Sequence, residues 1–75
     1  MRVSVLETRD VLYDEKAIKV VLPGREGEIC VLDFHQPFFY RLCKGRIIID
    51  DSFTIAIRDG VAHMQSNELV IMVEK

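Results

Sequence analysis

The stretch Phe53–Gly60, FTIAIRDG, decides the fold class because its apolar residues occur at every second position. Phe53, Ile55 and Ile57 fall on one side of an extended chain, and Thr54 and Arg58 fall on the other. A period of two is typical of a β-strand with one buried face. The strand is followed by Asp59-Gly60, a dipeptide that favours a type I′ turn. We therefore predict a β-hairpin centred on these two residues.

The same period continues in both directions along the chain, and no window shows the 3.6-residue repeat of a helix. We predict further strands at Arg2–Thr8, Val11–Asp14, Ala17–Leu22, Glu28–Leu32, Phe38–Arg41, Arg46–Asp50, Val61–Gln65 and Glu68–Glu74. Turn residues separate several of them, at Pro23-Gly24, Asp50-Asp51-Ser52 and Ser66-Asn67. Short strands without helices predict an all-β fold, an antiparallel two-sheet β-sandwich of about nine or ten short strands.

Two segments depart from the alternation, Arg46–Asp50 (RIIID) and Leu69–Val73 (LVIMV), since both are apolar at consecutive positions. Each must be covered on both faces or leave an apolar outer face in contact with solvent. A chain of 75 residues that is 49% apolar is too small for a second core. We expect the outer face to meet another protein. The inward positions are expected to include Ile55, Ile57, Leu69 and Ile71.

The composition excludes several classes of function. The formal net charge is -2 and the basic residues are scattered, whereas nucleic-acid binders usually carry clustered Lys and Arg. No apolar run approaches the roughly 20 residues needed to span a bilayer, and the N-terminal MRVSVLETRD alternates instead of forming a signal core. We expect one soluble cytoplasmic domain over residues 1–75, with membrane association only through partners.

The two cysteines, Cys30 and Cys43, are 13 positions apart, a spacing that matches no metal or redox motif. We expect two free thiols that serve as small apolar side chains. Cys30 and His35 together could make a nucleophile and a base, but no third residue is specified to orient the base. A small hydrolase would require these two side chains to meet in a pocket.

The loop region between residues 23 and 35 carries most of the polar candidates. Glu26, Glu28, Asp33 and His35 could be assembled into a metal site, although no recurrent ligand spacing is present. The Gly-rich segment Pro23–Glu28, PGREGE, precedes a strand, whereas phosphate-binding loops open a helix. We therefore predict no catalytic residues, no metal and no cofactor.

Taken as a string, Val20–Ile49 reads VVLPGREGEICVLDFHQPFFYRLCKGRIII and closely resembles the signature of the epsilon subunit of F-type ATP synthases, called delta in mitochondria. In that signature a turn leads into Glu-Gly-Glu, a short apolar strand and a loop that ends in His-x-Pro. The matching residues are Gly24, Glu26-Gly27-Glu28, Leu32, His35 and Pro37. Tyr13, Lys44-Gly45 and the closing Asp59–Lys75 segment extend the resemblance over essentially the whole chain.

The resemblance implies a non-catalytic rotor subunit at the foot of the central stalk, on the cytoplasmic face of the membrane. Its partners would be the gamma subunit and the c-ring, with no nucleic acid and no direct membrane insertion. By the same resemblance, the Glu26-Gly27-Glu28 loop faces the c-ring, with Glu28 as the main contact. His35 and Tyr40 match positions near the gamma subunit.

The sequence departs from the family pattern in several places. The customary Pro-Gly-His is Asp33-Phe34-His35 here, Cys30 replaces a glycine, and the Asp50–Ser52 turn is tighter than usual. The family usually continues into two C-terminal helices, and the sequence ends at Lys75, where they would begin. We therefore expect no helical hairpin. An alternative function is a free-standing β-sandwich that binds or regulates another protein, or a domain of a longer epsilon subunit.

Overall fold

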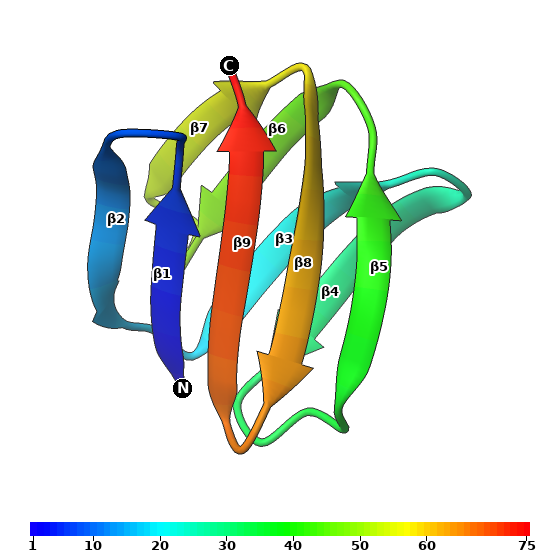
Figure 1. Ribbon diagram of the computed structural model, residues 1–75. Helices are drawn as coiled ribbons and strands as arrows, with labels where there is room; N and C mark the ends of the chain where they lie inside the picture. The colour runs from blue at the N-terminus through cyan, green and yellow to red at the C-terminus, as the bar shows by residue number, and fades with distance from the viewer.

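The computed structural model describes Met1 to Lys75 and consists of nine β-strands (Figure 1). The strands are β1 (Arg2–Leu6), β2 (Val11–Lys16), β3 (Lys19–Gly24), β4 (Gly27–Leu32), β5 (Phe38–Leu42), β6 (Gly45–Ile49), β7 (Phe53–Ile57), β8 (Asp59–Gln65) and β9 (Glu68–Glu74). No helix is long and apolar enough to cross a membrane. The predicted all-β fold is confirmed.

The strands form two layers that face each other. One layer has the order β2-β1-β9-β8-β5, and the other has β4 beside β3, followed by β6 and β7. In Figure 1 the first layer lies in front of the second. The layers are joined along one side by a single residue pair between β3 and β5, Gly24 with Leu42. All neighbouring strands are antiparallel except β1 and β9, which run parallel.

Two of the predicted turns have the backbone conformation that tight hairpins require. Asp50 and Asp51 join β6 to β7 with φ angles of 51° and 55°, and Ser66 and Asn67 join β8 to β9 with φ angles of 53° and 56°. Positive φ at both central residues is the mark of a type I′ turn, whose twist matches that of the flanking strands.

The hairpin predicted at Asp59-Gly60 is wrong. β7 pairs only with β6, whereas β8 pairs with β5 and β9, so the chain crosses from one layer to the other at Arg58. Gly60 does not have a positive φ. It lies within β8, where an added Cβ would be 2.7 Å from the carbonyl oxygen of Met72. This glycine therefore permits a close approach of two strands and does not form a turn.

The turn predicted at Pro23-Gly24 is displaced by two residues. Both residues belong to β3, and Arg25 and Glu26 form the connection to β4. Proline has no N–H to donate, and it interrupts a ladder wherever that donor is needed. β3 pairs with β6 only at Val20 and Val21, and then with β5 at Gly24. Pro23 therefore lies where β3 changes its partner from one layer to the other.

The core between the layers is entirely apolar, since no polar or charged side chain is buried. It includes the four residues predicted to lie inside, Ile55, Ile57, Leu69 and Ile71, with relative exposures between 0% and 6%. At one margin the rings of Tyr13 from β2 and Phe53 from β7 lie 5.1 Å apart and close the gap between the layers.

Candidate protein-interaction surfaces

The β3–β4 hairpin presents the residues that match the family's Glu-Gly-Glu. Gly27 has a φ of 125°, which is accessible to glycine and strained for other residues. A Cβ on Gly24 would lie 2.6 Å from Cδ1 of Ile29, so the hairpin is tightly closed. Glu26 and Glu28 are both exposed. Two carboxylates are thus held on a short and rigid element.

An open hollow of about 430 Å³ lies beside this hairpin. Its lining includes Glu26, Gly27 and Glu28 from the hairpin together with Tyr40 and Arg41 from β5. The hollow exists because β4 and β5 are not paired with each other. Four of the five residues proposed from the sequence as contact residues therefore line one surface.

The fifth of these residues, His35, does not line the hollow. A row of contacting aromatic side chains leads from His35 to Tyr40, which does line it. The His35 ring meets Phe38 edge-on at 5.3 Å, and Phe38 stacks on Tyr40 at 4.6 Å. Nδ1 of His35 is also within hydrogen-bond distance, 2.9 Å, of the Gln36 carbonyl oxygen. The aromatic row, defined here as His35, Phe38 and Tyr40, ends at the hollow.

Neither cysteine is hydrogen-bonded to His35, the residue considered as a base for Cys30. Cys30 and Cys43 are free thiols. Cys30 is exposed on β4, contrary to the expectation that both cysteines serve as buried apolar residues. The reason is the strand's alternation: its neighbour Val31 is the residue that faces the core. The single S–H of Cys43 is shared between two acceptors, the carbonyl oxygens of Pro23 and Gly24, which both lie 3.4 Å from Sγ.

The acidic and His side chains considered as metal ligands are likewise dispersed. No three His, Cys, Asp or Glu side chains are grouped so that they could hold a metal ion. Asp33 is engaged in an ion pair with the N-terminal ammonium group of Met1. His35 packs against Phe38.

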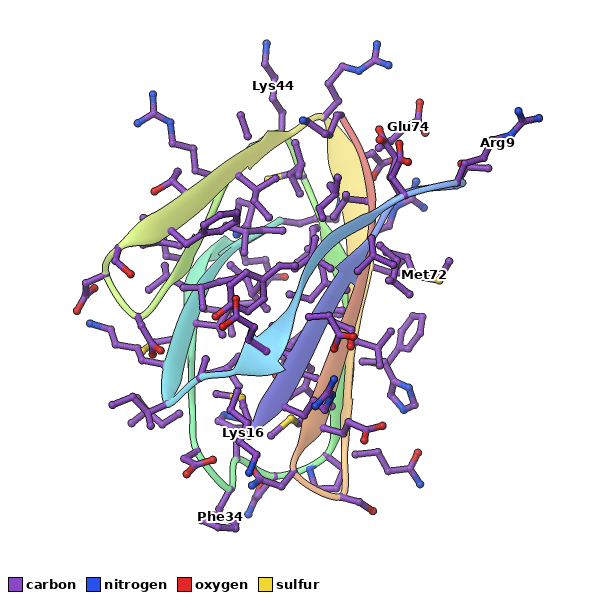
Figure 2. The ribbon with its side chains drawn as sticks, turned by 90° about the vertical axis from the view of Figure 1, so that its left-hand side faces the viewer. Arg9, Lys16, Phe34, Lys44, Met72 and Glu74 are labelled. Carbon is purple, nitrogen blue, oxygen red and sulfur yellow. The ribbon has the colours of Figure 1, made fainter.

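The outer face of the first layer carries uncovered apolar side chains. Phe39 on β5 is 67% exposed and Met72 on β9 is 54% exposed; Val61 on the intervening strand β8 and Val70 on β9 are half-buried. Figure 2 shows Met72 standing away from the sheet. The ring of Phe39 lies 6.0 Å from that of His63. The apolar outer face predicted from LVIMV is confirmed.

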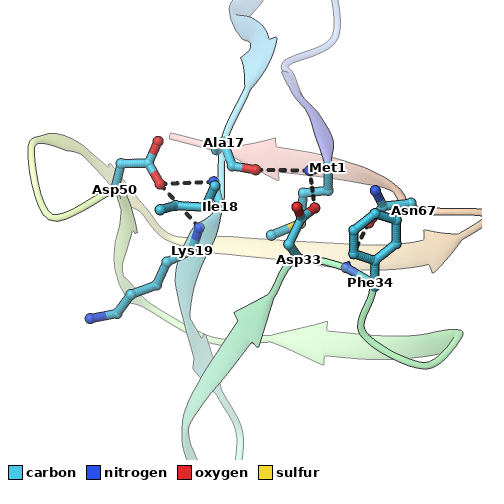
Figure 3. A network of polar contacts seen from close by, with 8 residues as sticks. All are labelled: Met1, Ala17, Ile18, Lys19, Asp33, Phe34, Asp50 and Asn67. Atoms are coloured by element: carbon cyan, nitrogen blue, oxygen red, sulfur yellow. Dashed lines mark hydrogen bonds and ion pairs between the residues drawn. The ribbon is translucent and has the colours of Figure 1, made fainter.

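A polar network fixes the end of the sandwich that holds the N-terminus, opposite the end that holds the C-terminus in Figure 1; Figure 3 shows this network from close by. The ammonium group of Met1 donates to the carbonyl oxygen of Ala17 at 2.9 Å and to the carboxylate of Asp33. The hydrogen bond to this ammonium group is the main cause that lowers the pKa of the Asp33 carboxyl. Phe34 donates its backbone N–H to Oδ1 of Asn67 at 2.8 Å.

The carboxylate of Asp50, also drawn in Figure 3, fixes the connection from β2 to β3, where the chain passes from one layer to the other. Oδ1 of Asp50 accepts hydrogen bonds from the backbone N–H groups of Ile18 and Lys19, both at 3.0 Å. The sequence indicated turns at Asp50 and Asn67 but gave no signal for these contacts. Their partners are 31 to 33 positions away in the chain.

Curated relatives of this chain are ATP synthase epsilon chains. ATP synthase epsilon chain 2 of Ralstonia nicotianae is 31% identical over 99% of this chain and 56% of the relative. The ATP synthase epsilon chain of Rickettsia bellii is 30% identical over 99% of this chain and 74% of the relative. The chain thus spans a little over half the length of the Ralstonia relative and about three quarters of the Rickettsia relative.

Solved structures show the same fold at low sequence identity. A chain of the Tetrahymena thermophila mitochondrial ATP synthase central stalk/c-ring structure gives a TM-score of 0.86 at 15% identity, covering 100% of this chain and 63% of that one. A chain of the Euglena gracilis mitochondrial ATP synthase gives 0.85 at 16% identity, covering 97% and 49%. The family model for the ATP synthase delta/epsilon chain beta-sandwich domain matches residues 1–75. The protein therefore belongs to the beta-sandwich domain family of ATP synthase delta and epsilon chains.

Proposed function

We propose that this chain is a non-catalytic component of the rotating central stalk of an F-type ATP synthase. It binds the gamma subunit and the c-ring and so couples ion-driven rotation to ATP synthesis. The observation that carries the proposal is the convergence of Glu26, Gly27, Glu28 and Tyr40 on one hollow of a sandwich that belongs to this family. Residues matched to two different partners are thus neighbours on one rigid body.

The contact with the c-ring is assigned to the β3–β4 hairpin, with Glu28 as its main residue. Glu28 is exposed, and its backbone is fixed by pairing with Pro23 beside a tight turn. An exposed carboxylate on a rigid element helps to orient the partner and raises the association rate, and it adds less to the affinity. Basic or amide groups on the polar loops of the ring would be its complement.

The contact with the gamma subunit is assigned to the aromatic row. Aromatic side chains are enriched in protein interfaces and account for much of their binding energy. Tyr40 is 41% exposed at the end of the row, and its ring is held in place by stacking on Phe38. The chain would then lie peripherally at the cytoplasmic face of the membrane, held there by its partners.

Binding measurements with purified components test this function. The chain should bind the isolated gamma subunit, and it should bind the gamma/c-ring assembly more tightly. Tyr40→Ala should weaken both interactions, whereas the control Thr54→Ala, at an exposed position on β7, should leave both unchanged. Binding to neither component would refute the proposed function and would favour the free-standing protein-binding module.

A further inference from the structure

We propose that Phe34 is an aromatic anchor that inserts into an apolar pocket of a central-stalk partner. This inference rests on the function proposed above, within which that partner is the gamma subunit. It concerns a residue outside both the hollow and the aromatic row.

Phe34 occupies a backbone conformation that does not suit it. The turn from Leu32 to His35 is closed by a hydrogen bond of 3.1 Å from the His35 N–H to the Leu32 carbonyl oxygen. Phe34 has a φ of 61°, whereas Asp33 before it does not have a positive φ. A positive φ at the third residue alone defines a type II turn, in which this position favours Gly or Asn. A bulky residue here is an outlier that calls for an explanation.

The side chain of Phe34 gives no compensation through packing. It is 79% exposed, more than any other large hydrophobic residue of the chain. Figure 2 shows the ring at the end of the molecule, directed away from the body. With this φ angle and this exposure, phenylalanine does not stabilise the folded chain. A partner that covers the ring would account for both.

The backbone around Phe34 is held from two sides (Figure 3). Its own N–H donates to Asn67 in the β8–β9 turn at 2.8 Å. The preceding Asp33 donates its N–H to the Ile18 carbonyl oxygen at 3.0 Å, and its carboxylate is paired with the ammonium group of Met1. The turn is therefore fixed before any partner binds, which lowers the entropic cost of binding.

The position of Phe34 favours gamma over the c-ring. Glu28 is the second residue of β4 and Phe34 follows the end of that strand, so the four residue steps from Glu28 to Leu32, about 13 Å of extended chain, lie between them. A c-ring that contacts the hairpin would therefore have to extend along β4 in order to reach Phe34. By contrast, Phe34 directly precedes His35, where the aromatic row begins. It thus continues the surface already assigned to gamma.

The local charges favour a protein pocket over a lipid surface. Attraction to anionic lipids requires a cluster of free basic side chains. Beside Phe34, the carboxylate of Asp33 already pairs with the ammonium group of Met1. At the same end of the sandwich, Lys19 pairs with Asp51, and Arg2 with Asp14. The chain as a whole has a net charge of -2.

The decisive variant is Phe34→Gly, because it removes the ring and also relieves the backbone. We expect its melting temperature to equal or exceed that of the wild type, while its Kd for purified gamma rises at least about tenfold. Phe34→Tyr keeps the ring but would bury an unpaired hydroxyl in an apolar pocket, so it should bind gamma less tightly than the wild type and more tightly than Phe34→Gly. Phe39→Ala removes a similarly exposed ring from the outer face and should weaken gamma binding much less.

Three results would overturn this inference. If Phe34→Gly binds gamma as tightly as the wild type, the ring is not an anchor. If Phe39→Ala weakens gamma binding as strongly, the loss reflects apolar surface in general. If Phe34→Gly binds isolated gamma normally but loses the extra affinity that the gamma/c-ring assembly has over isolated gamma, the partner of Phe34 is the c-ring. A wild-type chain that does not bind gamma would instead refute the proposed function.

Discussion

At the scale of single residues, Asp33 makes the stability of the fold dependent on pH. The ammonium group of Met1 lowers the pKa of its carboxyl in the folded chain. A carboxyl whose pKa is lower in the folded state stabilises that state above its unfolded pKa, near 3.9, and this stabilisation is lost as the pH falls through the folded pKa. We therefore expect a loss of stability below about pH 5.

Asp33→Asn tests this account. The variant should unfold at a lower temperature than the wild type at pH 7, because the ion pair is lost. The difference between the two should shrink as the pH falls toward 3. Thermal unfolding followed by circular dichroism over pH 3 to 7 gives both curves. A constant difference across this range would contradict the role assigned to the carboxylate charge.

Backbone conformation was only partly predictable at this scale. Asp and Asn tolerate positive φ because their short side chains form local hydrogen bonds, so the turns at Asp50-Asp51 and Ser66-Asn67 carried a local signal. Phe34 gave none. Non-glycine residues in this region typically cost about 1–3 kcal/mol and persist only where the surroundings impose the conformation. For Phe34 those surroundings include Asn67, which lies 33 positions away.

At the scale of elements, substitutions of Gly60 test whether this residue lies within strand β8 or in a hairpin turn. We expect Gly60→Ala to destabilise the fold by about 1–3 kcal/mol, because the new Cβ would lie 2.7 Å from the Met72 carbonyl oxygen. Gly60→Asn should be at least as destabilising. A type I′ turn would accept Asn with little loss. Chemical denaturation of both variants measures the difference, and a stable Asn variant would contradict the strand register of β8 and β9.

The existence of most strands was predictable, whereas their partners were not. Alternation reports which residues face the core, and it correctly placed Ile55, Ile57, Leu69 and Ile71 inside. It is silent about which strand lies next in the sheet. Asp59-Gly60 has the local chemistry of a hairpin, but β7 and β8 belong to different layers. Tertiary pairing here overrides a local turn signal.

At the scale of the whole molecule, the single apolar core limits the stability of so small a chain. Leu69 is fully buried in it. Leu69→Ala should lower the free energy of unfolding by about 2–5 kcal/mol, a large share of the about 5–15 kcal/mol typical of a domain. Thr54→Ala, at an exposed position, should change it by less than about 0.5 kcal/mol. Urea denaturation measures both. A loss below 1 kcal/mol for Leu69→Ala would contradict the core described here.

The sequence proposed individual contact residues, which remain a prediction, but it did not predict how they are arranged. The family pattern indicated Glu26, Gly27, Glu28, His35 and Tyr40 from their order in the chain. It did not indicate that the hairpin and Tyr40 line one hollow. That proximity depends on Pro23 and on the single β3–β5 residue pair, after which β4 and β5 remain unpaired.

The measurement that tests the central proposal most directly compares Glu28→Lys with the wild type in two assays, binding to isolated gamma and binding to the gamma/c-ring assembly. An exposed charge contributes modestly, so reversal should weaken the second interaction by about two- to tenfold and the first hardly at all. The effect should shrink at high salt, because exposed charges are screened. Equal losses in both assays would show that the hairpin faces gamma or supports the fold, and a loss in neither would remove it from the interface.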